Sequence, residues 1–217
     1  VGTGKLRPRE TVAQGLAAAP EAARIDPRGA LGVFFGYDFH LDAGHLGLIE
    51  VNTNAGGAML NAVLARAQRS CCGDMDGLVP TPASVDRFEQ RLVDMFRREW
   101  QLSRPDGPPL ARIAIVDDAP EEQYLYPEFI LARQMLMRAG YEVVIVAAEA
   151  LQFSNGSLLH RGKQIDLVYN RLVDFALEEP QHEALRLAYE AHAVALTPNP
   201  RNHALIADKR NLVACFA

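Results

Sequence analysis

The segment 48–57, Leu-Ile-Glu-Val-Asn-Thr-Asn-Ala-Gly-Gly, carries the densest set of side chains that could do chemistry. Side chains alternate along a strand, so Glu50 and Asn52 are expected on one face. A carboxylate beside an amide oxygen suits a hard cation such as Mg²⁺. The glycines that follow let a ligand approach the backbone closely. The open alternative is a solvent-facing edge strand that leads into an Asn- and Gly-rich turn.

Asp38 lies in an earlier run of strand-forming residues. Runs at 30–41 and 46–53, separated by Asp-Ala-Gly, predict a β-hairpin. Such a hairpin brings Asp38 toward the face that carries Glu50, where it would be a further metal ligand. The alternative is a surface carboxylate without a partner.

Two basic residues follow predicted strands or turns in the second half of the chain. Arg171 lies two residues beyond the end of an apolar strand at 165–169, where its guanidinium could clamp a substrate carboxylate with two hydrogen bonds. The alternative is a salt bridge to Glu178 or Glu179. Lys209, in Ala-Asp-Lys-Arg-Asn, could neutralise a phosphate, or it could be a solvated helical lysine.

An acidic loop at 117–124 follows the first strand of the second half and includes Gln123. We expect Gln123, together with Asn54, to contribute to substrate binding, although an acidic loop can also be simply solvated. The six histidines show no metal-ligand spacing, and the three cysteines form no disulfide pattern.

These residues require elements that position them. After a Pro- and Gly-rich linker at 104–109, apolar strands at 113–116, 143–146, 165–169 and 194–197 alternate with helices at 127–139 and 179–192. Alternation of this kind predicts a parallel sheet with helices on both faces, which binds ligands beyond the carboxyl ends of its strands. Further helices are expected at 8–24, 59–69 and 84–103, and a small hairpin at 151–164.

Composition narrows the class of protein. The 217 residues are 49% hydrophobic and 23% charged, with a formal net charge of −5, so a globular domain is expected and a nucleic-acid partner is not. The sequence contains no apolar run of the length that a membrane helix needs and no signal-peptide pattern. We therefore expect a cytoplasmic protein without a membrane partner.

Taken in order, several segments resemble eukaryotic-type glutathione synthetase, a carboxylate–amine ligase of the ATP-grasp superfamily. They are the following: 31–38 (Leu-Gly-Val-Phe-Phe-Gly-Tyr-Asp), 49–53 (Ile-Glu-Val-Asn-Thr), the 113–116 strand with its helix, 168–171 (Val-Tyr-Asn-Arg) and 207–209 (Ala-Asp-Lys). The resemblance implies the N-terminal α/β segment of an ATP-grasp core (1–104), a doubly wound substrate domain (110–200) and the start of an ATP-binding lobe (201–217).

The resemblance also implies roles. Glu50 and Asn52 correspond to ligands of the magnesium ion that accompanies ATP, and Asp38 to an acidic residue beside the active site. Arg171 corresponds to a substrate-binding arginine and Lys209 to a lysine that contacts the phosphates of ATP. The implied reaction activates a small acid or peptide as an acyl phosphate, which an amine then attacks.

The chain departs from the family at substrate-contacting positions. Gly36 and Tyr37 replace an arginine and a serine, the segment 54–57 replaces a serine-rich loop, and Asp174 replaces a tyrosine. The reaction type therefore transfers better than the substrate. Because the chain does not begin with Met and ends within a helical pattern, we expect a fragment that lacks the rest of the ATP site and is inactive by itself. A non-catalytic α/β binding module, a degenerate homologue and a homodimer remain open alternatives.

Overall fold

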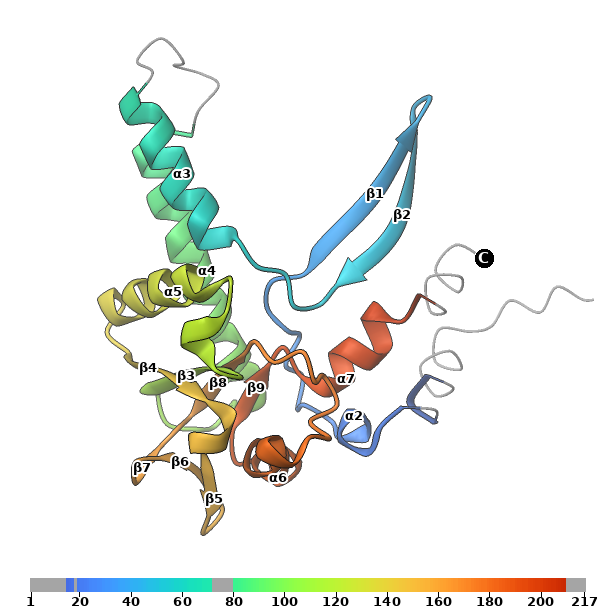
Figure 1. Cartoon of the computed structure of the whole chain (residues 1–217), viewed down its shortest axis with the longest axis vertical. Coiled ribbons are helices and arrows are strands. Elements are labelled where there is room, and N and C mark those ends of the chain that lie inside the picture. Colours follow the sequence, from blue (N-terminus) through green and yellow to red (C-terminus); the bar gives the residue numbers. More distant parts are fainter. Residues whose placement is uncertain (1–14, 18, 72–79, 210–217) are drawn as a thin grey trace, which may run out of the picture.

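A four-stranded parallel sheet forms the centre of the molecule (Figure 1). The computed structural model describes residues 15–17, 19–71 and 80–209. The sheet consists of β3 (Arg112–Asp117), β4 (Glu142–Ala147), β8 (Leu167–Asn170) and β9 (Ala195–Thr197). Its strands lie in the order β4-β3-β8-β9, and every neighbouring pair is parallel. The predicted mixed α/β class with a parallel sheet is confirmed.

Helices cover both faces of this sheet. Ile113 and Ile115 of β3 pack into one hydrophobic core, and Ala114 and Val116 into another, with all four side chains fully buried. The first core includes α4 and α5, and the second includes α6. The helices are α2 (Glu21–Arg24), α3 (Ala58–Cys71), α4 (Pro82–Ser103), α5 (Tyr126–Arg138), α6 (Glu183–Glu190) and α7 (Pro200–Asn202). Burial on both faces explains why the strands are continuously apolar.

The strand order reverses between β3 and β8. The chain passes from β3 to β4 on one side of the sheet and from β8 to β9 on the other. In open α/β sheets, ligands bind at this point, beyond the carboxyl ends of the two strands. Asp117 ends β3, and Arg171 follows β8.

A two-stranded antiparallel hairpin projects away from the sheet (Figure 1). It consists of β1 (Gly36–Asp42) and β2 (His45–Asn52), as the sequence predicts. Most of its residues are exposed, including the large side chains of Tyr37, Phe39 and Leu41. The hairpin therefore depends on contacts at its base for its position.

Two segments differ from the sequence-based expectation. The region 151–164 contains the expected hairpin and adds a third short strand to it, so that it consists of β5 (Gln152–Ser154), β6 (Ser157–His160) and β7 (Lys163–Gln164). The helix expected from 203 onward begins as a π-helical turn, η5 (His203–Ala207). The remaining short turns are η2 (Pro120–Glu122), η3 (Ala148–Ala150) and η4 (Pro180–His182). Most of the helix expected at 8–24 and the residues after 209 lie outside the described residues, and the expected domain boundaries stay a prediction.

Two buried carboxylates fasten the N-terminal part of the chain to the sheet and its helices. Glu99 of α4 accepts hydrogen bonds from the backbone N–H groups of Leu31 and Gly32, each at 2.9 Å, and from the Thr197 hydroxyl at 2.8 Å. Glu128 of α5 accepts from the N–H groups of Met59 and Leu60 at the start of α3. Both carboxylates satisfy backbone donors that would otherwise be buried without a partner.

We expect Glu99→Gln to destabilise the fold by about 1–3 kcal/mol, because an amide has one acceptor oxygen and leaves a buried donor unsatisfied. Urea unfolding measures the change. Glu149→Gln, at an exposed site, is the control and should stay within about 0.5 kcal/mol of the parent. Equal stability of the two variants would contradict a fastening role for Glu99.

Candidate functional site

Glu50 and Lys209 meet on the hairpin. Lys209 Nζ lies 2.7 Å from Glu50 Oε2, and Asp38 is the direct partner of Glu50 across the two strands. The hydrogen bond and charge of Lys209 lower the pKa of Glu50, and those of Glu50 raise the pKa of Lys209. Because both side chains are well exposed, the pair adds little stability. The location of this ion pair is informative, because it brings Glu50, an expected metal ligand, next to Lys209, the expected phosphate contact.

A β-bulge directly precedes Glu50. Asp38 pairs with Glu50 and Phe39 pairs with Leu48, which leaves Ile49 as an additional residue in β2. Bulges re-aim the side chains that follow them and occur often beside active sites. The bulge was not foreseen from the sequence.

Asn52 lies two residues beyond Glu50, at the exposed end of β2. Its Oδ1 accepts a hydrogen bond from the backbone N–H of Asn54 at 2.9 Å. This contact shapes the turn and leaves the second lone pair of the amide oxygen for another partner. Asp38, Glu50 and Asn52 thus offer oxygen donors along one stretch of the hairpin.

His203 fastens the base of the hairpin. Its Nδ1 lies 2.8 Å from Thr53 Oγ1, and its ring stacks on Phe175 with centroids 3.6 Å apart and planes 7° apart. Burial lowers the pKa of His203, which favours the neutral ring. The segment that ends at Lys209 is therefore held against both the hairpin and the loop after β8. Sequence reasoning missed this role because Thr53 is remote along the chain.

Arg171 connects the same base to the sheet. Its Nη1 donates to Asn54 Oδ1 at 2.5 Å and to the Ala55 carbonyl at 3.1 Å, and its guanidinium lies over the Tyr169 ring. The residue is 7% exposed. Its Nε is buried and has no hydrogen-bond partner among the described residues. The alternative salt bridge to Glu178 or Glu179 is not among the ion pairs of the described part of the chain.

One of the two glycines after β2 packs against side chains of the protein itself. A Cβ on Gly56 would lie 2.8 Å from Leu125 and 3.3 Å from Arg171 Nη2. Gly56 therefore lets the side chains of Leu125 and Arg171 approach the loop closely.

The two expected substrate-binding residues occupy different places. Asn54 contacts Arg171 and donates through Nδ2 to the carbonyls of Arg171 and Leu172, each at 3.4 Å. Gln123 donates to the carbonyl of Asp118 at 2.6 Å and so closes the loop after β3. In this structure both residues shape loops at the carboxyl edge of the sheet.

A histidine that the sequence did not single out lies at the strand-order reversal. His182 is fully buried, with Nδ1 2.8 Å from Asp174 Oδ2 and Nε2 2.9 Å from Asp118 Oδ1. Burial disfavours its charged form, but the hydrogen bonds to Asp118 and Asp174 outweigh burial and raise the pKa of His182. The imidazole ties the loop after β3 to the loop after β8.

Asp117 lies beside this tie and is 8% exposed. Burial raises the pKa of Asp117 to about 6, although the N–H of Asp118 and the charge of Arg171 both act to lower it. A carboxyl group that titrates near neutral pH at a sheet's ligand-binding edge is a candidate functional group.

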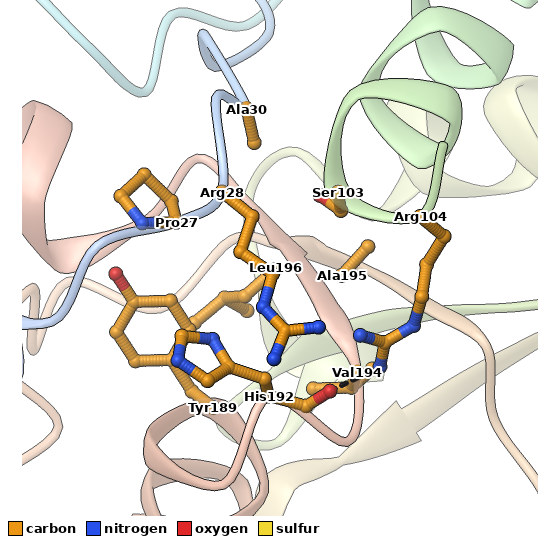
Figure 2. Close-up of a pocket in the computed structure, with 10 residues that line it drawn as sticks. All are labelled: Pro27, Arg28, Ala30, Ser103, Arg104, Tyr189, His192, Val194, Ala195 and Leu196. Carbon is orange, nitrogen blue, oxygen red and sulfur yellow. Dashed lines mark hydrogen bonds between the residues drawn. The ribbon is translucent and has the colours of Figure 1, made fainter. Parts of the chain in front are cut away.

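The described cavities differ in size. An open cavity of about 330 Å³ lies beside the hairpin base, lined in part by Asp174, Phe175 and His203. A cavity of about 10 Å³ lies at the start of β9, where Figure 2 shows Arg28, Arg104 and His192 close together. The second has room for about one water molecule. Burial and the charges of Arg28 and Arg104 lower the pKa of His192 there. Of these two cavities, the one beside the hairpin base is the better space for a small molecule, and open cavities of about 510 and 370 Å³ lie elsewhere on the described residues.

None of the helices in the described ranges combines the length and apolar content that a membrane crossing requires.

Comparison with known proteins supports the fold. No protein-family model matches the sequence, and no curated protein matches it. Among solved structures, the chain is similar to a glutathione synthetase-like effector from Globodera pallida in its apo form, with a TM-score of 0.60 and 19% identity. The match covers 93% of this chain and 47% of the effector, so the chain spans about half the effector's length. The chain thus has a fold similar to that of a glutathione synthetase-like protein.

Proposed function

We propose that the protein is an ATP-dependent carboxylate–amine ligase similar to glutathione synthetase. One observation carries the proposal: Glu50 and Lys209, expected to bind magnesium and phosphate, lie 2.7 Å apart although they are remote in the sequence. The fold similarity supports the same assignment. A nucleotide triphosphate with its metal needs both kinds of group side by side, an oxygen ligand for the cation and a cation for the phosphates.

The residues present fit a magnesium ion. Asp38, Glu50 and Asn52 offer only oxygen donors, and hard cations such as Mg²⁺ prefer carboxylate and carbonyl oxygen. Lys209 already compensates the charge of Glu50, so the hairpin balances opposite charges before any ligand arrives. The ion would neutralise phosphate oxygens of ATP, while Lys209 would contact the phosphates directly.

Arg171 would hold the acid or peptide substrate. The hydrogen bonds of its side chain that the structure describes are all made by Nη1, and the buried Nε has no partner in the described chain. Nε and Nη2 together form the edge of a guanidinium that grips a carboxylate with two parallel hydrogen bonds. Hydrogen bonds hold Nη1, so the edge formed by Nε and Nη2 is oriented in advance. Because Nε is buried and Nη2 packs against Gly56, a substrate would reach this edge only after the loop at Gly56 moves.

The reaction we propose has two steps. An oxygen of the substrate carboxylate attacks the terminal phosphorus of ATP, ADP leaves, and an acyl phosphate forms. The nitrogen of the amine then attacks the acyl carbon, an amide bond forms, phosphate leaves and the amine loses a proton. The residues of this chain contribute positioning and charge, through Lys209 at the phosphates and Arg171 at the substrate.

We predict that Glu50→Gln lowers Mg²⁺-dependent ADP release by orders of magnitude in the whole protein, because the amide binds a hard cation more weakly than a carboxylate. ADP release is measured with a panel of small acids or peptides and amines. Asp42→Asn is the matched control, since Asp42 is an exposed carboxylate at the far end of the same hairpin. Unchanged activity of Glu50→Gln at limiting Mg²⁺ would rule out the metal role, and an inactive parent would favour a binding module.

We also predict that Arg171→Lys raises the Michaelis constant for the acid or peptide while that for ATP changes little. An ammonium cannot form the two parallel hydrogen bonds, and losing a charge-assisted contact costs about 1.5–3 kcal/mol, or roughly 10- to 150-fold in affinity. Steady-state kinetics and a melting curve are recorded on the same variant. A lower melting temperature with an unchanged Michaelis constant would mean that Arg171 only fastens the loop at Asn54.

A further inference from the structure

Three potential metal ligands converge at the carboxyl edge of the sheet, at residues that the proposed ligase reaction does not use. Single ligand atoms of Asp118, Glu179 and His182 all lie within 4.8 Å of one another. Asp118 follows β3, whereas Glu179 directly precedes η4 and His182 is its last residue. The fold therefore brings them together from two separate loops.

The histidine of this group is held as metal-binding histidines are held. His182 is fully buried, and its Nδ1 contacts Oδ2 of Asp174. Asp174 lies outside the three-residue group, and its Oδ2 also accepts the backbone N–H of Glu179 at 2.9 Å. A carboxylate on one ring nitrogen fixes the ring and directs the other nitrogen to the metal. Here Nε2 forms a hydrogen bond with Oδ1 of Asp118, 2.9 Å away, and a metal ion would take the place of the proton between these two atoms.

The charges around the group call for a cation. Asp118 and Glu179 lie beside His182, and Asp174 and the buried Asp117 extend the acidic surroundings. Arg171 lies on the side of Asp117, and His182 loses its proton when it binds a metal. A divalent ion would offset the excess of negative charge.

We propose that Asp118, Glu179 and His182 bind a first-row divalent transition metal such as Zn²⁺, with Asp174 as the carboxylate that orients His182. An imidazole nitrogen with two carboxylates suits Zn²⁺ and not Mg²⁺, which prefers oxygen alone. Metal–ligand distances of about 2.0–2.2 Å place tetrahedral ligand atoms roughly 3.3 Å apart, so His182 Nε2 and Asp118 Oδ1, now 2.9 Å apart, would separate slightly and Glu179 would adjust to complete the site. The exposed Glu179 has the freedom to make that movement. This site is separate from the hairpin and stands independently of the ligase assignment.

The test is a calorimetric titration of the metal-free protein with ZnCl₂, with excess MgCl₂ present to fill sites made of oxygen alone. We expect saturable binding of one Zn²⁺ that Glu179→Gln weakens at least about 10-fold, since even an orienting residue is worth about 10- to 100-fold in affinity. Asp174→Asn should weaken binding by about that amount. Glu178→Gln, which alters the exposed neighbour outside the group, should bind as the parent does.

Circular dichroism of each variant shows that the fold is intact, and the exposed position of Glu179 favours that outcome. The proposal is overturned if the parent shows no saturable Zn²⁺ binding. It is equally overturned if Glu179→Gln and Asp174→Asn bind Zn²⁺ as tightly as Glu178→Gln does, because the ion would then be held elsewhere, for example by cysteine thiolates. Neither readout depends on ligase activity, so failure here leaves the proposed reaction untouched.

Discussion

The guanidinium of Arg171 ties the base of the projecting hairpin to the carboxyl edge of the parallel sheet. Its hydrogen bonds to Asn54 and Ala55 join a loop of the N-terminal half to the residue that follows β8. The hairpin itself is mostly exposed and has little packing of its own. The location of Glu50 relative to the sheet therefore depends on this tie, together with the contact between Thr53 and His203.

Burying the Arg171 side chain at this junction costs free energy, which the rest of the fold must offset. Arg171 and Asp117 are both nearly buried, and removing charges from water is unfavourable unless they are paired and hydrogen-bonded. Carbonyl oxygens satisfy one edge of Arg171, whereas burial raises the pKa of Asp117 to about 6. The apolar cores on the two faces of the sheet supply the stability that allows such groups to persist. Ligand-binding sites often contain side chains, such as these two buried charged groups, that do not maximise the stability of the fold.

The sequence predicted the scaffold well because its signals are local. Continuous apolar runs predicted β3 and β4, and alternation predicted a strand that carries Glu50 and Asn52. In the turn of the small 151–164 region, Asn155 and Gly156 have positive φ angles, as a two-residue hairpin requires. The two-residue strand β7 and the bulge at Ile49 escaped prediction, because neither leaves a period long enough to detect.

The contacts that build the candidate site were harder to foresee. Arg171 and Asn54 are 117 positions apart in the sequence, and His182 and Asp118 are 64 positions apart. Rules based on the spacing of nearby residues do not predict contacts over such separations. His203 was set aside with the other histidines because they show no metal-ligand spacing, and its contact with Thr53, 150 positions away, leaves no local signal. The nearness of Lys209 to Glu50 followed from the family resemblance, because no periodicity or spacing links the two residues.

The most direct measurement of the central claim is paramagnetic broadening of amide signals in the NMR spectrum of the protein on addition of ATP with substoichiometric Mn²⁺. Mn²⁺ accepts the oxygen ligands that suit Mg²⁺ and broadens only nearby signals. The account predicts selective broadening at Asp38, Glu50, Asn52 and Lys209, with Asp42 at the far end of the hairpin less affected. Sharp signals at those four residues in the presence of Mn²⁺ and ATP would contradict a metal–phosphate site on the hairpin.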